Sequence, residues 1–116
     1  MEELCKKPSA GDPTMTVYKS RIALNARACF ILRVSEGGRI GFVKKGQVLY
    51  IFRCDKPCGG YNLVFRKGRR GAVVNSTHLA GEIAYAVGGH GICRLRNDIS
   101  FFENGVRHFG VVHHLD

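Results

Sequence analysis

The sequence predicts an α+β fold that is dominated by strands and built from two similar halves. Its 116 residues are the usual size of one domain. Most apolar segments are short, rich in β-branched residues and bounded by Gly or Asn, which is typical of strands and turns. Only two segments carry apolar residues at helical spacing, and each follows an Asn that ends a strand. We therefore expect one domain over residues 14–116, preceded by a flexible arm over residues 1–13.

The first half of the domain is expected to begin with a strand and a short helix. Asn25 can cap that helix, because its side chain accepts backbone N–H groups. Within the helix, Ala28, Cys29, Ile31 and Leu32 share one face and Arg27 points away from it. The expected elements are a strand over 16–24, a helix over 25–33, and strands over 39–43 and 48–52 that are joined by a turn over 44–47. The last strand is apolar on both faces, so we expect it to be central in a sheet.

The second half repeats this order with a longer helix. After a turn over 54–60, the expected elements are strands over 61–65 and 71–74, a helix from Asn75–Ser76 to Gly88, and strands over 90–96, 99–103 and 106–113. The apolar face of the helix is expected to consist of Leu79, Ala80, Ile83, Ala84 and Val87. Asn104–Gly105 is a strong hairpin signal between the last two strands.

The two halves align as an internal repeat, at about residues 16–60 and 61–116. Ile22–Asn25 matches Ala72–Asn75 at a spacing of fifty positions, and both segments run from a strand into a capped helix. Three further apolar positions match at a spacing of fifty-three, namely Val34, Ile40 and Phe42 against Val87, Cys93 and Leu95. The alternative is a chance similarity in a chain that is rich in Gly and Val.

The charge of the chain suggests an anionic partner. Eighteen Lys and Arg residues against nine Asp and Glu residues give a formal net charge of +9 and a pI near 9.7. Basic surfaces bind nucleic-acid phosphates with salt-sensitive affinity. The alternative is that the charge only keeps the protein soluble. No apolar run approaches the roughly 18 residues that span a bilayer, and no signal sequence opens the chain, so we expect a cytoplasmic protein without membrane contact.

The five cysteines fit the same compartment, because an odd number spread along the chain makes no disulfide framework. Cys54 and Cys58 are weak candidates for metal ligands, since a single CxxxC pair lacks the second pair of a zinc finger. A turn between two strands is the preferred interpretation of that segment. No nucleophile elbow or HExxH motif is present, so we expect no enzyme activity, no catalytic residues and no cofactor.

The segment from Arg21 to Phe42 resembles the AbrB-like swapped-hairpin proteins, which include SpoVT-type transition-state regulators and MazE-type antitoxins. The matching positions are Arg21 for the leading Arg, Ile22 and Leu24 for the alternation, Leu32 and Val34 for the helix exit, Gly37 and Gly38 for the turn, and Ile40 and Phe42 for the strand. The resemblance covers residues 16–52, with a weaker second copy over 70–113. It implies a small barrel of two interleaved halves that binds DNA. Either a homodimer supplies the halves, or one chain supplies both as an internal pseudo-dimer.

The chain departs from that family at several positions. Asn25 stands in place of Pro, Gly38 in place of Asp, and Cys29 and Phe30 stand where DNA-contacting arginines are common. Only Arg21 carries over directly. The whole chain is also similar to small proteins encoded on Bacteroides chromosomes and mobile elements, in which openings of the Asn-Ser-x-x-Leu-Ala type recur. That similarity implies no activity.

We therefore expect a non-enzymatic DNA-binding protein, with a transcriptional regulator or an antitoxin as the specific form and RNA as an alternative partner. The alternative function is a protein-interaction or structural module of a mobile element that binds no nucleic acid. The candidate nucleic-acid-binding residues are Lys19, Arg21, Arg27, Arg39, Arg66, Lys67, Arg69 and Arg70. Tyr18, Tyr50 and Tyr61 are candidates for stacking on bases, although we expect most of them in the core. The two functions differ in whether the basic residues share one face of the molecule.

Overall fold

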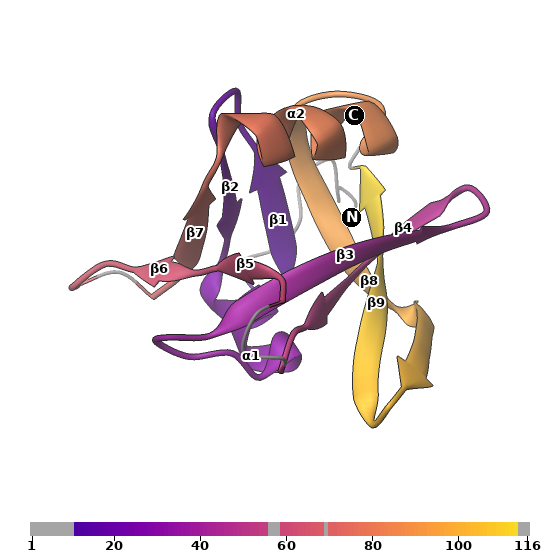
Figure 1. The fold of residues 1–116 in the computed structure, drawn as a ribbon, viewed down its shortest axis with the longest axis horizontal. Coiled ribbons are helices and arrows are strands. Elements are labelled where there is room, and N and C mark those ends of the chain that lie inside the picture. Colours follow the sequence, from indigo (N-terminus) through magenta and orange to yellow (C-terminus); the bar gives the residue numbers. More distant parts are fainter. Residues whose placement is uncertain (1–10, 56–58, 69, 114–116) are drawn as a thin grey trace, which may run out of the picture.

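One antiparallel sheet of nine strands forms most of the protein in the computed structural model, which describes residues 11–55, 59–68 and 70–113. Residues 1–10 of the expected arm lie outside this part. The strands follow the order β5-β3-β4-β9-β8-β1-β2-β7-β6, and two helices complete the strand-rich α+β fold (Figure 1). In chain order the elements are β1 (Thr14–Val17), β2 (Arg21–Leu24), α1 (Ala26–Leu32), β3 (Arg39–Lys45), β4 (Val48–Arg53), β5 (Tyr61–Asn62), β6 (Val64–Phe65), β7 (Ala72–Asn75), α2 (Thr77–Val87), β8 (Gly91–Glu103) and β9 (Val106–His113).

The sheet curls until its two ends meet. β5 and β6 stand at opposite ends of the strand order, yet only Leu63 separates them in the chain. Leu63 is buried, and its backbone N–H donates to the carbonyl of Gly38 at 3.0 Å. β5 pairs with β3 at one end of the sheet, and β6 pairs with β7 at the other end. Because β5 and β6 are almost continuous, the sheet nearly closes into a small barrel. The single strand expected over 61–65 is divided at this point.

Hairpins from the two halves of the chain alternate around the barrel. The hairpins β1–β2 and β3–β4 come from residues 14–53, whereas β6–β7 and β8–β9 come from residues 64–113. In the strand order, β9 and β8 lie between β4 and β1, and β7 follows β2. The hairpins β1–β2, β3–β4 and β8–β9 thus have neighbours from the other half on both sides, and β7 pairs with β2 of the first half, so neither half forms a continuous sheet by itself.

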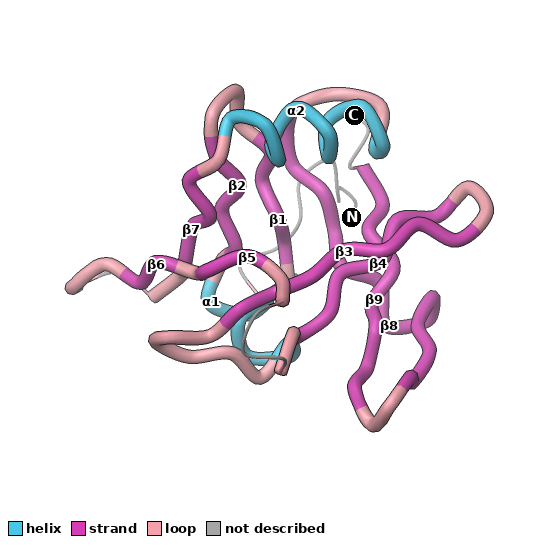
Figure 2. Tube along the Cα trace, viewed as in Figure 1, coloured by secondary structure: helices cyan, strands magenta, loops and turns pink. Residues whose placement is uncertain are grey.

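Alternate side chains of the strands fill the interior of the barrel. Its largest fully buried side chains include Met15, Ile22, Ile40 and Ile51. The two helices cover opposite ends of the barrel (Figures 1 and 2). They bury Ala28, Cys29 and Leu32 from α1, and Leu79, Ala80, Ile83 and Ala84 from α2. The helix faces expected from apolar spacing are therefore confirmed, with Ile31 and Val87 partly buried against the core.

Both helices begin at side-chain caps, as their sequences predict. The Oδ1 of Asn25 accepts from the backbone N–H of Ala28 at 2.8 Å, and Ser76 caps α2 in the same way. Asn25 makes two further hydrogen bonds. Its Oδ1 accepts from the N–H of Thr14 at 3.1 Å, and its Nδ2 donates to the carbonyl of Asp12 at 2.7 Å. The start of α1 is thereby tied to the start of β1.

The first strand differs from the expectation. A single strand was expected over 16–24, whereas β1 and β2 form a hairpin with a tight turn between them. Val17 pairs with Ile22, and the N–H of Tyr18 donates to the carbonyl of Arg21 at 2.9 Å. Apolar residues alternate on both sides of this turn, and no Gly or Pro marks it. Ser20 is the one turn-favouring residue there, so the reversal carries only a weak local sequence signal.

The turn expected at Asn97–Asp98 is also absent, because β8 continues through these residues with a shift in register. The shift lies between Arg96 and Ser100 in the pairing with β9. The guanidinium of Arg96 makes two hydrogen bonds to the carboxylate of Asp98, at 2.9 and 2.6 Å. Beyond this point β8 and β9 continue as a two-stranded arm that projects from the barrel (Figure 1).

Candidate nucleic-acid interface

A cleft of about 370 Å³ lies on the outer face of β2 and β7. These strands pair antiparallel, with Ala23 directly opposite Val73. Their inward side chains, Ile22 and Val74, are buried in the core, so the alternate residues face outward. Ala23 and Val73 form the floor of the cleft. Both side chains are short and apolar, which leaves room for a ligand above them.

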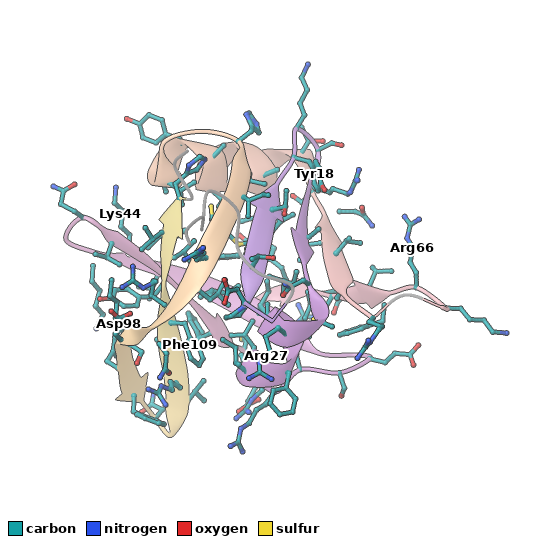
Figure 3. All side chains as sticks on the ribbon, turned by 180° about the vertical axis from the view of Figure 1, so that it is seen from behind. Tyr18, Arg27, Lys44, Arg66, Asp98 and Phe109 are labelled. Carbon is teal, nitrogen blue, oxygen red and sulfur yellow. The ribbon has the colours of Figure 1, made fainter. Side chains whose placement is uncertain are left out.

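Two walls flank this floor, and both carry arginines. Tyr18 and Arg21 come from the turn before β2 and from its first residue, whereas Arg66 and Arg70 come from the turn before β7. Figure 3 places Tyr18 and Arg66 on the same side of the barrel, away from Lys44. Three of the eight candidate residues are thus brought together: Arg21, Arg66 and Arg70.

The positive charge of the cleft is uncompensated among the described residues. No acidic residue lines the cleft, and no described carboxylate forms an ion pair with Arg21, Arg66 or Arg70. The guanidinium of Arg21 lies 4.3 Å from the centroid of the Tyr18 ring, and Tyr18 is 41% exposed. A concave surface with three free cations and an exposed ring is suited to bind an anion that has a flat group attached.

The second wall depends on Gly71 and Gly68. A Cβ atom at Gly71 would lie 2.2 Å from the carbonyl oxygen of Leu24, so only glycine lets the chain pass this close to the end of β2. Gly68 has a φ of +80°, which lets the chain reverse between Arg66 and Arg70. The two glycines thereby bring both arginines to the cleft.

Arg39 lies outside the cleft and has a structural role. Its guanidinium donates to the carbonyls of Gly59 and Gly60, and to the Oδ1 of Asn62 at 2.7 Å. These bonds hold the approach to β5 against the start of β3. The side chain therefore supports closure of the barrel, and its donors are already engaged.

The other predicted residues are exposed at different places. Arg27 lies on α1 with its guanidinium 5.3 Å from the ring centroid of Phe30, at another end of the molecule from Arg66 (Figure 3). Lys19 and Lys67 are exposed in the two turns that carry the cleft walls, without lining the cleft. Arg69 lies outside the described residues. The eight candidates therefore do not form one face, so the expected support for nucleic-acid binding is reduced to the three arginines of the cleft.

The tyrosines that were expected mostly in the core are not buried. Tyr18 and Tyr61 are exposed, and Tyr50 is half-buried against Phe101, with ring centroids 4.8 Å apart. The expectation was wrong because aliphatic side chains occupy most of the barrel interior, and the outer faces of the strands carry these rings.

An aromatic ladder that the sequence did not predict lies on the outer face of β4, β9 and β8. Phe52, His108 and Phe101 are partners on adjacent strands, and their rings stack with centroids 4.2 and 4.7 Å apart. His108 is buried, and its Nδ1 donates to the carbonyl of Val106 at 2.9 Å. A Cβ atom at Gly41 would lie 2.6 Å from the Phe52 ring, so this glycine makes room for the ladder. Only the strand register brings these residues together.

A second depression, of about 530 Å³, is less suited to an anion. It is lined by Arg33, Arg39 and Arg53, but also by Glu36 and Asp55. Arg53 makes two hydrogen bonds to Asp55, at 2.8 and 3.1 Å, which raise the pKa of its guanidinium. The two carboxylates offset most of the positive charge there, and the guanidinium of Arg39 already donates to Gly59, Gly60 and Asn62.

The described residues contain no group of three or more His, Cys, Asp or Glu side chains that could hold a metal ion. Of the two weak candidates, Cys54 lines the second depression and Cys58 lies outside the described residues. Cys29 and Cys93 are buried, and burial raises the pKa of each thiol to about 11. Both are therefore protonated at neutral pH and act as core side chains.

Neither helix in the described part of the chain is long and apolar enough to cross a membrane. Comparison of the chain with protein-family models, with curated proteins and with solved structures gave no significant match.

Proposed function

We propose that the protein is a non-enzymatic DNA-binding protein whose cleft contacts the phosphates of the nucleic acid. The observation that carries the proposal is the convergence of Arg21, Arg66 and Arg70 on one cleft that no acidic residue lines. Guanidinium groups bind phosphate oxygens with charge-assisted hydrogen bonds of defined geometry. The net charge of +9 adds a long-range attraction for a polyanion.

The cleft also offers a surface for a base or a sugar. Tyr18 is exposed beside Arg21, and both aromatic rings and guanidinium planes stack on bases. Lys19 and Lys67 extend the positive surface along the two turns that form the walls. A transcriptional regulator or an antitoxin is the specific form of this proposal, and RNA is the competing ligand because it carries the same phosphates.

We also propose that the barrel consists of two interleaved copies of one unit, as in a swapped-hairpin plan. The alternation of hairpins supports this, and so does the strand register. Ala23 pairs with Val73 at the spacing of fifty positions that relates the sequence halves, and the corresponding pair of adjacent strands, β4 and β9, has Ile51 opposite Phe109. Exchanging β1 for β5–β6, β2 for β7, β3 for β8 and β4 for β9 leaves every neighbour in the strand order unchanged.

Fluorescence anisotropy of a labelled duplex of mixed sequence, titrated across salt, tests the DNA-binding proposal. We expect micromolar binding that weakens steeply with salt, and a log–log salt slope that changing Arg21, Arg66 and Arg70 together to Ala reduces by about 3. Lys44→Ala is the matched control, because this exposed cation lies on the opposite edge of the barrel (Figure 3). Absence of binding at low salt would refute the proposal.

A protein-interaction module is the second candidate. The observation that favours it is the exposure of large rings outside the cleft: Phe30 is 69% exposed, Tyr85 90% and Phe102 67%. These rings lie on α1, α2 and β8, and the two helices cover opposite ends of the barrel (Figure 2). Single exposed apolar residues are common on soluble proteins, so the rings carry less weight than the cleft. If the protein binds no DNA in the anisotropy titration, the protein-interaction module becomes the preferred function.

A further inference from the structure

We propose that the cleft over β2 and β7 is a binding site for a free nucleoside 5′-monophosphate, with the phosphate at one end of the floor and the base at the other. The ligand is a small molecule, so this site goes beyond DNA binding and stands or fails separately from it. The cleft volume of about 370 Å³ lies within the usual range of small-molecule sites, roughly 300–1,000 Å³.

The phosphate end of the cleft carries two arginines. Arg66 follows β6 and Arg70 precedes β7, so the turn between these paired strands brings both side chains to the same end of the floor. Both side chains are exposed, and no acidic residue lines the cleft. A phosphate monoester carries close to two negative charges at neutral pH, whereas the diester of a nucleic-acid backbone carries one. Two guanidinium groups at one end therefore match a terminal phosphate in charge and in hydrogen-bond geometry.

The other end of the cleft is suited to a base. Arg21 lies there, directly opposite Asn75 in the pairing of β2 with β7. One face of its guanidinium stacks on the Tyr18 ring, with 4.3 Å to the ring centroid. No other aromatic ring of the described residues contacts this guanidinium, so its second face is open to a base. Guanidinium planes and aromatic rings both stack on bases.

The distance between the two ends fits one nucleotide. Leu24 lies beside the turn with the two arginines, three residues after Arg21 in β2. At roughly 3.3 Å per residue, the ends are about 10 Å apart. An extended nucleoside 5′-monophosphate spans a similar length from its phosphorus to the far edge of its base. The floor between the ends consists of Ala23 and Val73, and Val64 adds an exposed apolar side chain, so the sugar lies on an apolar surface.

Isothermal titration calorimetry with adenosine 5′-monophosphate (AMP) as the probe tests the site. We expect submillimolar affinity for AMP and about 10-fold weaker binding of adenosine and of ribose 5-phosphate, because each lacks the group that one end holds. Changing Arg66 and Arg70 together to Ala is expected to weaken AMP binding about 10-fold and to leave adenosine binding unchanged. Arg21→Ala is expected to weaken the binding of AMP and of adenosine alike. Lys44→Ala is the charge control, because Lys44 lies away from the cleft (Figure 3).

Filling the floor tests the position of the ligand without changing any charge. Ala23→Ile places a larger side chain on the floor and introduces a residue that strands favour. We expect it to abolish measurable AMP binding. Val112→Ile is the matched control, because Val112 is a partly exposed strand residue outside the cleft. Circular dichroism checks the fold of each variant. If Ala23→Ile does not fold, the changes at Arg66 and Arg70 decide, because these residues lie in a turn.

Three outcomes overturn the proposed site. The first is no AMP binding at millimolar concentration. The second is inorganic phosphate binding as tightly as AMP, which would show that the base end contributes nothing. The third is an unchanged AMP affinity in a folded Ala23→Ile variant, which would place the ligand outside the cleft.

An anisotropy titration of duplex DNA on the same samples separates this site from the proposed function. DNA binding without AMP binding refutes the nucleotide site alone. AMP binding without DNA binding supports the nucleotide site and refutes the proposed function.

Discussion

The guanidinium of Arg21 stacks on the ring of Tyr18, with its central carbon 4.3 Å from the ring centroid. A long arginine side chain loses considerable rotamer freedom when a ligand fixes it. The attraction between the cation and the ring fixes part of that geometry beforehand. Tyr18, which follows β1 in the turn before β2, therefore helps to hold the guanidinium of Arg21 in place at the cleft.

Replacing the ring tests this coupling. We expect Tyr18→Ala to weaken DNA binding by about 2- to 5-fold, because an exposed cation–π contact is worth about 0.5–1 kcal/mol. The salt slope is expected to stay the same, since the three arginines remain. Anisotropy titration measures both quantities, with Tyr85→Ala on α2 as the control for loss of an exposed ring. An unchanged affinity would show that Arg21 does not depend on the ring.

Gly71 is expected to tolerate no side chain. In Gly71→Ala the new methyl group meets the carbonyl oxygen of Leu24 at 2.2 Å, so we expect a loss of about 1–3 kcal/mol in the free energy of unfolding. Gly81→Ala is the matched control, because no atom lies within 4 Å of its Cβ position on α2. That substitution is expected to add about 0.5–1 kcal/mol. Urea denaturation compares the two, and equal stabilities would contradict the close approach at Gly71.

Asn25 is expected to matter more than an ordinary helix cap. Asn25→Ala removes the cap of α1 and also leaves the N–H of Thr14 and the carbonyl of Asp12 without this partner. We expect a loss of about 2 kcal/mol, against about 1 kcal/mol for Ser76→Ala, which removes a cap alone. Chemical denaturation measures the difference. If the two variants lose the same stability, the bonds to the start of β1 contribute nothing.

The buried thiols predict a loss of stability at high pH. Burial raises the pKa of Cys29 and Cys93 from 9.0, the value of an exposed thiol, to about 11. The stabilisation is therefore complete below pH 9.0 and is lost as the pH rises from 9.0 to about 11, because the unfolded state ionises first. Within this window each thiol lowers the free energy of unfolding by up to about 1.4 kcal/mol per pH unit.

Urea denaturation between pH 8 and pH 11 checks this expectation. The variant with Cys29→Ala and Cys93→Ala starts from a lower stability, because it lacks two buried sulfur atoms. Its stability is nevertheless expected to fall less steeply with pH than that of the wild-type protein. Parallel pH profiles of the two proteins would show that the thiols do not titrate differently in the folded and unfolded states.

The elements that local chemistry defines were predictable from the sequence. Asn25 and Ser76 predict the starts of the two helices, because their side-chain oxygens accept from backbone N–H groups that have no acceptor within the helix. Asn104–Gly105 marks the β8–β9 hairpin because both residues adopt positive φ angles, of 54° and 77°. The apolar strand over 48–52 is indeed central, since β4 lies between β3 and β9. Each of these features depends on residues that are close together in the chain.

Features that depend on distant partners were not predictable. Arg39 is a candidate phosphate ligand by residue type. Only its position beside Gly59 and Asn62 reveals that its guanidinium donors are already engaged. The same holds for His108, which packs between Phe52 and Phe101 through the register of three strands. Three cleft arginines were among the candidates because charge is visible in a sequence. Their convergence depends on the pairing of β2 with β7, which no local pattern specifies.

The alternation of hairpins around the barrel also determines how the chain can fold. Thr14 pairs with Arg94, and Leu49 pairs with Val111, so sheet contacts join residues that are far apart in the sequence. The entropy of closing such loops is lost before the contacts repay it, which makes folding slow. A hairpin of one half finds its neighbours only in the other half. The chain is therefore expected to fold in a single cooperative step. Two separate half-chains would together contain every strand of the barrel, so they are expected to associate and restore it.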